Sequence, residues 1–417
     1  MKVPLLDLKL QYAQIKDEIR SAIDEVLESQ QFIFGPKVEA FEKEIAHYMQ
    51  VDHAIGVSSC TDALFISLKA LKIVKEEKKE EEVFVITSPF TFFSTASSIS
   101  RVGATPLFVD IDPLTYTISP EKMEETISSL KNDQRMKVKA IIPVHLYGQC
   151  AEMDSIAKIA KKYHSKIIED AAQALGAKHL SKGSAESYQF AGSRGDFGCL
   201  SFFPTKNLGG YGEGGMVVTQ DAALADMVRK LRHHGSRSQQ EQYYYDEIGI
   251  NGRLDALQAA ILQVKLKYLD QWNSKRRLNA NNYNKLFKEM GLVTDIGSHD
   301  LEEKPLVLPY VKDGNYHVFH QYVIRARKRD RLKEFLKQNG IGCGIYYPLP
   351  IHLQPCYQES RHLQSCYQKL RLDYKEGSFK EAERAAREVI ALPIYPELTI
   401  EQQELVVRTI KQFYRKK

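Results

Sequence analysis

Short apolar runs alternate with helical patterns from residue 54 to residue 218. The helical patterns include residues 62–71 and 154–163, and the apolar runs are residues 54–57, 83–87, 106–109, 140–144, 167–169, 200–203 and 216–218. Strands separated by helices are typical of a mainly parallel sheet that helices cover on both faces. The alternation therefore predicts an α/β domain built as a three-layer sandwich.

A second, smaller domain is expected towards the C-terminus, because 417 residues exceed what one small core needs. After a helical pattern at residues 255–269, the alternation fades into a polar helix at 271–290 and a mixed segment, and a last helix begins at Ile400. We predict that residues 1–268 form the large domain, which includes an N-terminal helix. Residues 269–417 are predicted to form a small α+β domain.

The charge of the chain does not indicate nucleic-acid binding. The 58 basic and 53 acidic residues are mixed along the sequence and give a net charge of +5, with no basic arm or stripe. Hydrophobic residues make up 43% and charged residues 27%, as in ordinary folded proteins. The dense run at residues 75–82 carries both signs, and we interpret it as a solvated helix end and loop.

The cysteines and the N-terminus give no sign of a metal site or of export. The six cysteines are scattered without a C-x-x-C pair, so neither a disulfide framework nor a zinc site is indicated. Residues 1–7 lack the pattern of a signal peptide, and no apolar run approaches the roughly 20 residues that cross a bilayer. We expect a cytoplasmic protein that holds no metal and does not bind membranes.

Asp170 stands at the end of an apolar run, where the ligands of parallel sheets gather. Its carboxylate could cap the next helix. Alternatively, it could pair with a protonated pyridine nitrogen and keep that ring cationic, so that the ring accepts electrons from a substrate carbanion. Gln173 could then donate a hydrogen bond to the phenolic oxygen of the same ring, or it could be a helix-surface residue.

Lys206 lies in a segment that favours a reactive amine. Phe202 and Phe203 precede it and suggest partial burial, which lowers the pKa of an ammonium group or favours an imine. Glycines follow at positions 209, 210, 212, 214 and 215, and such a backbone can bend closely around a ligand. Because an arbitrary lysine is a solvated surface charge, the interpretation depends on the neighbouring loops.

Two further loops fit the same ligand. Residues 57–64 run from a strand end into a helix through Cys60 and Thr61. A helix N-terminus of this kind binds phosphate, or a hydroxyl group simply caps it. Residues 88–95 place Phe92 at a strand end, where its ring could stack on a planar ligand or pack into the core.

In this order the four loops resemble those of the DegT/DnrJ/EryC1/StrS family of sugar aminotransferases. That family belongs to fold type I of the pyridoxal phosphate (PLP) enzymes, the aspartate aminotransferase type. The resemblance extends over nearly the whole chain and includes residues 4–8, 35–36, 145–149, 249–255 and 347–354. It implies a PLP transferase fold with a mainly parallel sheet and a smaller C-terminal domain.

The resemblance also implies roles for the residues around the cofactor ring. Lys206 would carry PLP as a Schiff base and would move the proton between the amino donor and the cofactor. Asp170 would pair with the pyridine nitrogen, Gln173 would bind the phenolic oxygen, and Phe92 would stack on the ring.

At the cofactor phosphate, the resemblance implies that Ser201, Cys60 and Thr61 are ligands. Cys60 stands where the family commonly has glycine, so a close approach of the backbone to the phosphate is less secured there. Asn251 is similar to a residue that reaches the phosphate of the neighbouring subunit. This similarity implies a homodimer with two shared sites.

Two segments, residues 75–82 and 356–380, differ from the usual lengths in this family. The wider stretch 354–380 is rich in Gln, Ser, Tyr and charged residues, and we expect it to be a surface excursion. We expect both segments to lie on the surface, and the second to be a candidate for altering the rim that contacts a nucleotide.

The activity implied by the resemblance is transfer of an amino group from L-glutamate to a keto group of a nucleotide-linked sugar, for an amino sugar of surface polysaccharide or a related glycoconjugate. Dehydratases of the family have histidine in place of the lysine, and Lys206 argues against that activity. Two alternatives stay open. They are a transaminase of a cyclitol or aminobenzoate-type precursor, and a regulatory relative without turnover.

No substrate role is assigned to the residues that could form the rim of the site. These residues are His145, Tyr147, Arg253, His317, His320, Tyr346, Tyr347 and His352.

Overall fold

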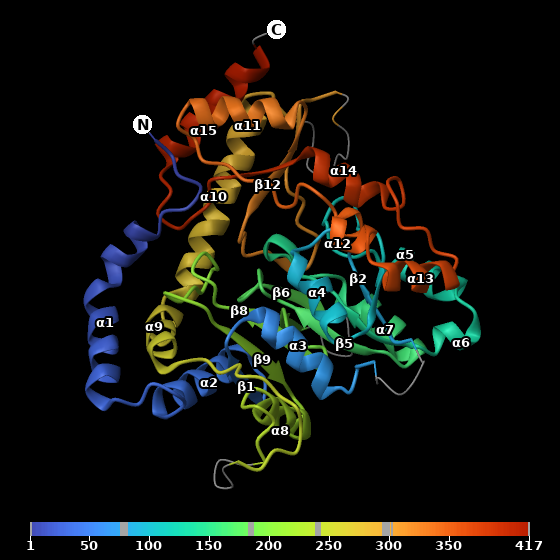
Figure 1. Cartoon of the computed structure of the whole chain (residues 1–417). Coiled ribbons are helices and arrows are strands. Elements are labelled where there is room, and N and C mark those ends of the chain that lie inside the picture. Colours follow the sequence, from blue (N-terminus) through green and yellow to red (C-terminus); the bar gives the residue numbers. More distant parts are fainter. Residues whose placement is uncertain are drawn as a thin grey trace.

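The computed structural model describes residues 2–75, 82–181, 187–237, 243–293, 301 and 303–415. Figure 1 shows a large α/β part built on a central sheet and a second part. The second part contains α10 (Leu269–Glu289), β12 (Tyr322–Ala326), α11 (Arg329–Gln338) and α15 (Ile400–Arg415). Both termini lie beside this second part.

The central sheet has seven strands in the order β1-β9-β8-β5-β4-β2-β3. Every neighbouring pair from β8 to β3 is parallel, and only β9 runs against its two neighbours. The strands are β1 (His53–Val57), β2 (Phe84–Thr87), β3 (Thr105–Phe108), β4 (Val138–Ile142), β5 (Lys166–Asp170), β8 (Phe197–Ser201) and β9 (Gly215–Thr219). The predicted three-layer α/β sandwich is confirmed.

Helices cover both faces of the sheet. On one face lie α3 (Cys60–Ala70), α4 (Phe93–Arg101) and α8 (Ala222–Leu231). On the other face lie α2 (Pro36–Met49), α5 (Pro120–Ser129), α7 (Met153–Tyr163) and α9 (Ala256–Leu266). Successive strand residues point to opposite faces, so Cys199 packs towards α3 and Leu200 towards α2 and α9.

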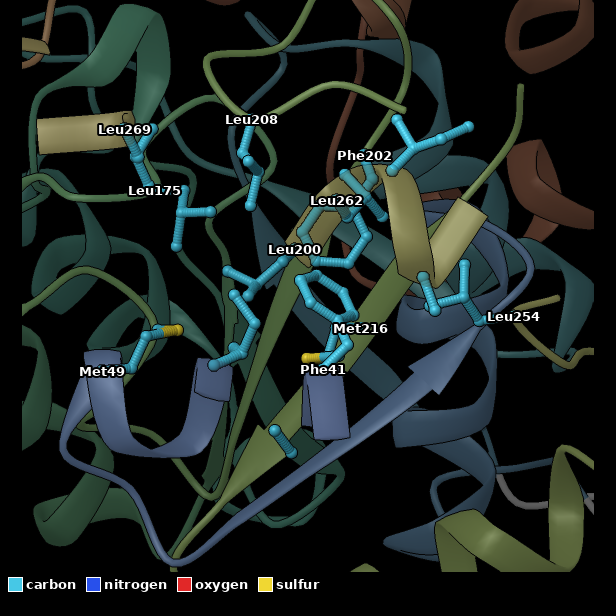
Figure 2. Packing of buried hydrophobic residues seen from close by; sticks show 14 of the residues in the cluster. Phe41, Met49, Leu175, Leu200, Phe202, Leu208, Met216, Leu254, Leu262 and Leu269 are labelled. Atoms are coloured by element: carbon cyan, nitrogen blue, oxygen red, sulfur yellow. The ribbon is translucent and has the colours of Figure 1, made fainter. Parts of the chain in front are cut away.

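The core beneath α2 and α9 anchors the segment that carries Lys206. Figure 2 shows Phe41, Leu200, Phe202 and Met216 packed together. The rings of Phe41 and Phe202 meet edge to face, with centroids 5.3 Å apart. The chain that leaves β8 therefore turns over a fully buried aromatic residue before it reaches the lysine.

The second part contains an antiparallel sheet in the order β10-β12-β13. Its elements are α10 (Leu269–Glu289), β10 (Leu306–Val307), β12 (Tyr322–Ala326), α11 (Arg329–Gln338), α14 (Lys380–Glu388), β13 (Val389–Leu392) and α15 (Ile400–Arg415). Helix α10 contributes Trp272 to the core of the large part and Tyr283 to the core of the second part. The domain limits 1–268 and 269–417 stay a prediction.

The N-terminal segment bridges the two parts. Val3 pairs with Ile341 of the second part, and its amide donates to the carbonyl of Gly340 at 3.0 Å. Asp7 then caps α1 (Leu8–Ser29) by accepting from the amide of Lys9 at 3.0 Å. Residues Leu5 and Leu6 are thereby held between the two parts of the molecule.

Two local predictions differ from the structure. The strand expected at 200–203 is Phe197–Ser201, because Gly198 breaks the apolar pattern at its start and Phe202 and Phe203 already belong to the next loop. A small sheet of β6 (Lys178–Ser181), β7 (Ser187–Phe190) and β11 (Asn315–Tyr316) was not predicted. Its strands are too short and too polar to stand out from a loop.

The prediction that residues 354–380 form a surface excursion is correct for most of their polar residues, which are exposed, but it missed the helices and a buried aromatic face. The segment folds into α12 (Pro355–Gln358), α13 (Arg361–Lys369) and a loop whose aromatic residues are buried. The hydroxyl of Tyr367 donates to the carbonyl of Pro106 at 3.0 Å, and Tyr374 Oη accepts from the amide of Phe108 at 3.2 Å. Polar residues between these aromatics hid the packing surface in the sequence.

Most of the charge run at 75–82 lies outside the described residues. At the two ends of the run, Lys75 Nζ donates to Glu82 Oε1 at 3.2 Å.

Two short helical elements complete the large part. They are α6 (Asn132–Arg135) and the 3-10 turn Leu146–Gly148, and a second 3-10 turn is Ile351–Leu353. In the part of the chain that the structure describes, no helix combines the length and the apolar composition needed to cross a membrane.

Candidate functional site

A cavity of about 540 Å³ opens at the carboxyl ends of the parallel strands. Among the residues that line it are Cys60, Thr61, Phe92, Asp170, Gln173, Ser201 and Lys206. Parallel strands end at one edge of a sheet, and their following loops therefore meet there. Asn251 is the exception among the predicted site residues, since its side chain is exposed and does not line the cavity.

Asp170, the last residue of β5, is buried beside the cavity. Its Oδ2 accepts from Thr95 Oγ1 at 2.8 Å, and its Oδ1 accepts from the amide of Ala172 at 3.2 Å. Burial raises the pKa of this carboxyl group, while the Thr95 hydroxyl, the Ala172 amide and Lys206 oppose the rise. A cation beside Asp170 would therefore be strongly favoured, as a pyridinium partner requires.

The preceding residue, Glu169, faces away from the cavity and is fully buried. His145 Nδ1 accepts from the amide of Ala151 at 3.0 Å, so Nε2 carries the proton and donates to Glu169 Oε2 at 2.8 Å. Amides of residues 192, 194 and 195 also donate to this carboxylate, at 2.6–2.9 Å. Burial alone would raise the pKa of Glu169, but these hydrogen bonds lower it.

Lys206 reaches the cavity from the loop after β8. Its amide donates to the carbonyl of Phe203 at 2.9 Å, which closes a tight turn. Burial lowers the pKa of the Lys206 ammonium group, although Cys60 and Asp170 act in the opposite direction. The free amine, which is the form that attacks a carbonyl carbon, is therefore available at lower pH than on a surface lysine.

The glycines after Lys206 serve the packing of the protein against itself. A Cβ atom on Gly209 would lie 2.3 Å from the carbonyl oxygen of Pro204, and one on Gly215 would lie 2.3 Å from the carbonyl carbon of Ser59. From the sequence alone, these glycines are expected to let the backbone bend closely around a ligand. The neighbours of Gly209 and Gly215 are instead backbone atoms of the protein, and those of Gly210, Gly212 and Gly214 are mainly side-chain atoms of Gln258, Leu254 and Phe202.

The N-terminus of α3 supplies the anion-binding end of the site. Ser59 is a plain helix cap, because its Oγ accepts from the amide of Asp62 at 3.1 Å. Cys60 and Thr61 follow as the first helical residues, whose amides have no acceptor within an α-helix. Together with the helix dipole and the hydroxyl of Ser201 in the cavity wall, they form a fitting phosphate site.

Phe92 is 55% exposed and stands at the cavity against Tyr347, with ring centroids 6.1 Å apart. Gln173 is held by protein groups on both ends of its amide. Its Oε1 accepts from the amide of Tyr147 at 2.7 Å, and its Nε2 donates to Tyr347 Oη at 3.1 Å. One N–H of Gln173 is left for a ligand oxygen.

Sequence reasoning missed several residues that line the cavity or support its wall. Thr95 orients Asp170, and only its place one helical turn after Thr91 could have indicated a shared face. Arg276 of α10 lines the cavity and donates to the carbonyl of Ile394 at 2.9 Å. Asn207 Oδ1 lies 3.0 Å from His320 Nδ1 and fixes that imidazole at the cavity wall. No sequence motif indicates Arg276, because it lies on α10, far along the chain from the loops that carry the predicted site residues.

Only three of the residues considered for the rim line the cavity, namely His320, Tyr346 and Tyr347. Burial and the nearby Lys206 hold the pKa of His320 well below its usual range, so this imidazole is neutral. The others are occupied elsewhere. His145 binds Glu169, His352 binds Glu383 and His317 stacks on Phe319, while Tyr147 donates to the carbonyl of Tyr346 and Arg253 Nη1 contacts His233.

The donor set fits PLP. A buried carboxylate, a half-buried amine of lowered pKa, an exposed aromatic ring and a helix N-terminus face one cavity, and each matches a different part of that molecule.

Comparisons with known proteins agree with this arrangement. The model of the DegT/DnrJ/EryC1/StrS aminotransferase family matches residues 13–411. A "Pleiotropic regulatory protein" of Geobacillus stearothermophilus is 47% identical over 100% of this chain and 99% of its own length. A UDP-N-acetyl-3-dehydro-alpha-D-glucosamine 3-aminotransferase of Acidithiobacillus ferrooxidans is 38% identical over 98% of this chain and 97% of its length. The crystal structure of S. venezuelae DesV in complex with a ketimine intermediate superposes with a TM-score of 0.86 at 34% identity, covering 100% and 99% of the two chains.

The substitution Gly215→Ala tests the contact between the start of β9, which follows the lysine loop, and the N-terminus of α3. The added Cβ would meet Ser59 and Cys60 backbone atoms at 2.3 and 2.6 Å, so the phosphate-facing turn must move. We expect the Kd for PLP to rise about tenfold or more, which corresponds to about 1.4 kcal/mol. This Kd is measured by titrating the apoprotein with PLP and recording the absorbance. Gly212→Ala is the matched control, since its Cβ meets only the Gln258 side chain, at 3.1 Å. Equal affinities of the two variants would contradict the assignment.

Proposed function

The chain belongs to the DegT/DnrJ/EryC1/StrS aminotransferase family, and on that premise we propose that it transfers an amino group from L-glutamate to a keto group of a nucleotide-linked sugar. The enzyme is a PLP-dependent aminotransferase. The observation that carries the proposal is the convergence of Lys206, Asp170 and the N-terminus of α3 on one cavity. No single loop would distinguish this chemistry from ordinary caps and surface charges.

We assign the steps of the reaction to side chains of this chain. PLP, when bound, supplies the electron sink for the carbon–hydrogen bond that breaks. Lys206 would hold the cofactor and, as a free amine, would take the proton from the donor carbon and deliver it to the cofactor carbon that keeps the nitrogen. Asp170, oriented by Thr95, would hold the positive charge of the ring nitrogen. Gln173 would donate to the phenolic oxygen, and Phe92 would stack on the ring face.

An anionic amino donor such as glutamate fits the charge of the cavity wall. Arg276 is buried, and its hydrogen bonds go to the carbonyls of Phe319, His320 and Ile394. Burial lowers the pKa of Arg276 to about 10, and the nearby carboxylate of Glu397 opposes that shift. The positive charge at the cavity wall would still attract a carboxylate that enters the cavity.

A nucleotide-linked keto sugar is the proposed acceptor, and its product would serve an amino sugar of surface polysaccharide or a related glycoconjugate. The relative from Acidithiobacillus ferrooxidans carries the name of an enzyme that acts on a UDP-linked keto sugar, and that relative matches this chain over nearly its whole length. A transaminase of a cyclitol or aminobenzoate-type precursor is the alternative acceptor class.

A second candidate function is a regulatory protein without turnover. The observation that favours it is the name of the relative from Geobacillus stearothermophilus, which is 47% identical to this chain. The complete set of Lys206, Asp170 and Gln173 at one cavity supports catalysis instead, because a protein without turnover has no need of a half-buried lysine of lowered pKa.

We propose a homodimer in which Asn251 completes the phosphate site of the partner. Asn251 lies outside its own cavity, and the segment before it exposes Tyr243 and Ile248 by 83% and 84%. Exposed apolar side chains of this size mark an interface. Sedimentation of the purified protein should give about twice the chain mass of 47.6 kDa, and Ile248→Asp should shift it towards the single chain. A fully active protein that sediments as one chain would refute the dimer.

The proposed activity is tested by incubating the PLP-loaded protein with L-glutamate and a panel of UDP-, dTDP- and GDP-linked keto sugars. We expect 2-oxoglutarate to form together with one aminated sugar. Lys206→Ala should lower kcat by at least about 10³-fold, because it removes both the covalent link and the proton carrier. Lys267→Ala is the control, since Lys267 is an exposed residue paired with Glu18 at 3.5 Å.

Three outcomes would contradict parts of this proposal. Turnover of a cyclitol ketone or an aminobenzoate-type precursor in place of every sugar would select the alternative acceptor. Full activity of Lys206→Ala would remove the assigned role of the lysine. Absence of any spectral change on adding glutamate, with intact PLP binding, would favour the regulatory function.

A further inference from the structure

The two segments whose lengths depart from the resembled family meet at one edge of the central sheet. Glu82 comes just before β2, and His362 and Cys366 lie on α13. Among the described residues, ligand atoms of these three side chains all lie within 4.8 Å of one another. This cluster lies apart from the cavity, which none of the three residues lines.

Helix α13 presents His362 and Cys366 in a geometry that suits a tetrahedral metal ion. Residues four apart in an α-helix lie on the same face, and Cys366 Sγ is 3.8 Å from His362 Nε2. Metal–ligand bonds of about 2.3 Å to sulfur and 2.05 Å to nitrogen at a tetrahedral angle place these two atoms about 3.6 Å apart. The observed separation therefore needs only a small rotation of the exposed imidazole.

Glu82 supplies the third ligand. Its Oε1 is held by Lys75 Nζ at 3.2 Å, while its Oε2 is buried without a well-aligned hydrogen bond, and the Cys366 thiol lies beside the same carboxylate as a donor. A metal ion that takes the place of the thiol proton would be bound by the carboxylate and the thiolate together. The Lys75 contact would at the same time orient the carboxylate, as outer groups around metal ligands commonly do.

Packing holds the helix face in place. Tyr367, next to Cys366, is buried and donates to the carbonyl of Pro106 in β3 at 3.0 Å. Tyr357 of α12 contacts Phe93 with ring centroids 6.0 Å apart, at the start of α4. The cluster thus lies where α12 and α13 join the sheet edge and the helix that follows Phe92.

We propose that Glu82, His362 and Cys366 bind one Zn²⁺ ion, with water as the fourth ligand, and that this ion fastens α13 to the sheet edge. The set of one thiolate, one imidazole and one carboxylate suits Zn²⁺, whereas Mg²⁺ and Ca²⁺ require oxygen ligands. Cys366 binds as the thiolate and releases its proton to solvent.

The test is a metal titration of the PLP-loaded protein after treatment with a chelator. Cobalt(II) is the spectroscopic probe, since a thiolate ligand gives an intense near-ultraviolet charge-transfer band, and Zn²⁺ is then added as competitor. We expect one cobalt ion per chain and a Zn²⁺ Kd below about 1 μM. His362→Ala, at an exposed position, should weaken Zn²⁺ binding at least about tenfold and remove the rise in Tm that Zn²⁺ causes.

Cys366→Ser should abolish the charge-transfer band. Because Cys366 is buried, that variant could fail to fold, and Glu82→Gln then serves as the second test and should weaken Zn²⁺ binding. Cys356→Ser is the matched control, because Cys356 is an exposed cysteine on the neighbouring α12 and lies outside the cluster. A missing band, a Zn²⁺ Kd above about 1 μM, or equal binding by wild type and His362→Ala would overturn the proposal.

Discussion

The site depends on how β5 ends. Pairing of Glu169 with Gly198 and of Asp170 with Cys199 fixes β5 against β8. Successive strand residues face opposite sides, so the two neighbouring carboxylates point in opposite directions. Glu169 is locked by His145 and by three backbone amides. Asp170 is thereby held at the cavity with a single side-chain partner, Thr95, and with its charge free to act on a ligand.

Burial sets the chemistry of Lys206, and the packing of the whole molecule sets the burial. The large part contributes the lysine loop over Phe202. The second part closes the cavity through Arg276 and His320, and the bridging N-terminal segment closes it through Leu5 and Leu6. Helix α10 belongs to the cores of both parts. The cavity wall is therefore shared, and a change in the way the two parts meet would alter the environment of the amine.

The sequence was sufficient where chemistry follows local pattern. Alternating apolar runs predicted the parallel sheet, and strand ends predicted that Asp170, Thr61 and Lys206 would lie together at one cavity. The sequence was insufficient where the contacting residues lie far apart along the chain. Arg276 comes from α10, and the metal ligands Glu82 and Cys366 are almost three hundred positions apart, so no spacing rule could unite them. Buried aromatics among polar residues likewise hid the packing of α13.

The central claim is that Lys206, and no other lysine, binds the cofactor covalently. Lys265 is the sharpest rival, because it is buried next to the same loop, donates to the carbonyl of Gly209 and has its pKa lowered by burial to about 8. Reduction of the PLP-loaded protein with borohydride, followed by proteolysis and mass spectrometry, identifies the attached residue. The account predicts the pyridoxyl label on the peptide that contains Lys206. A label on Lys265 or on any other lysine, or no label at all, would contradict it.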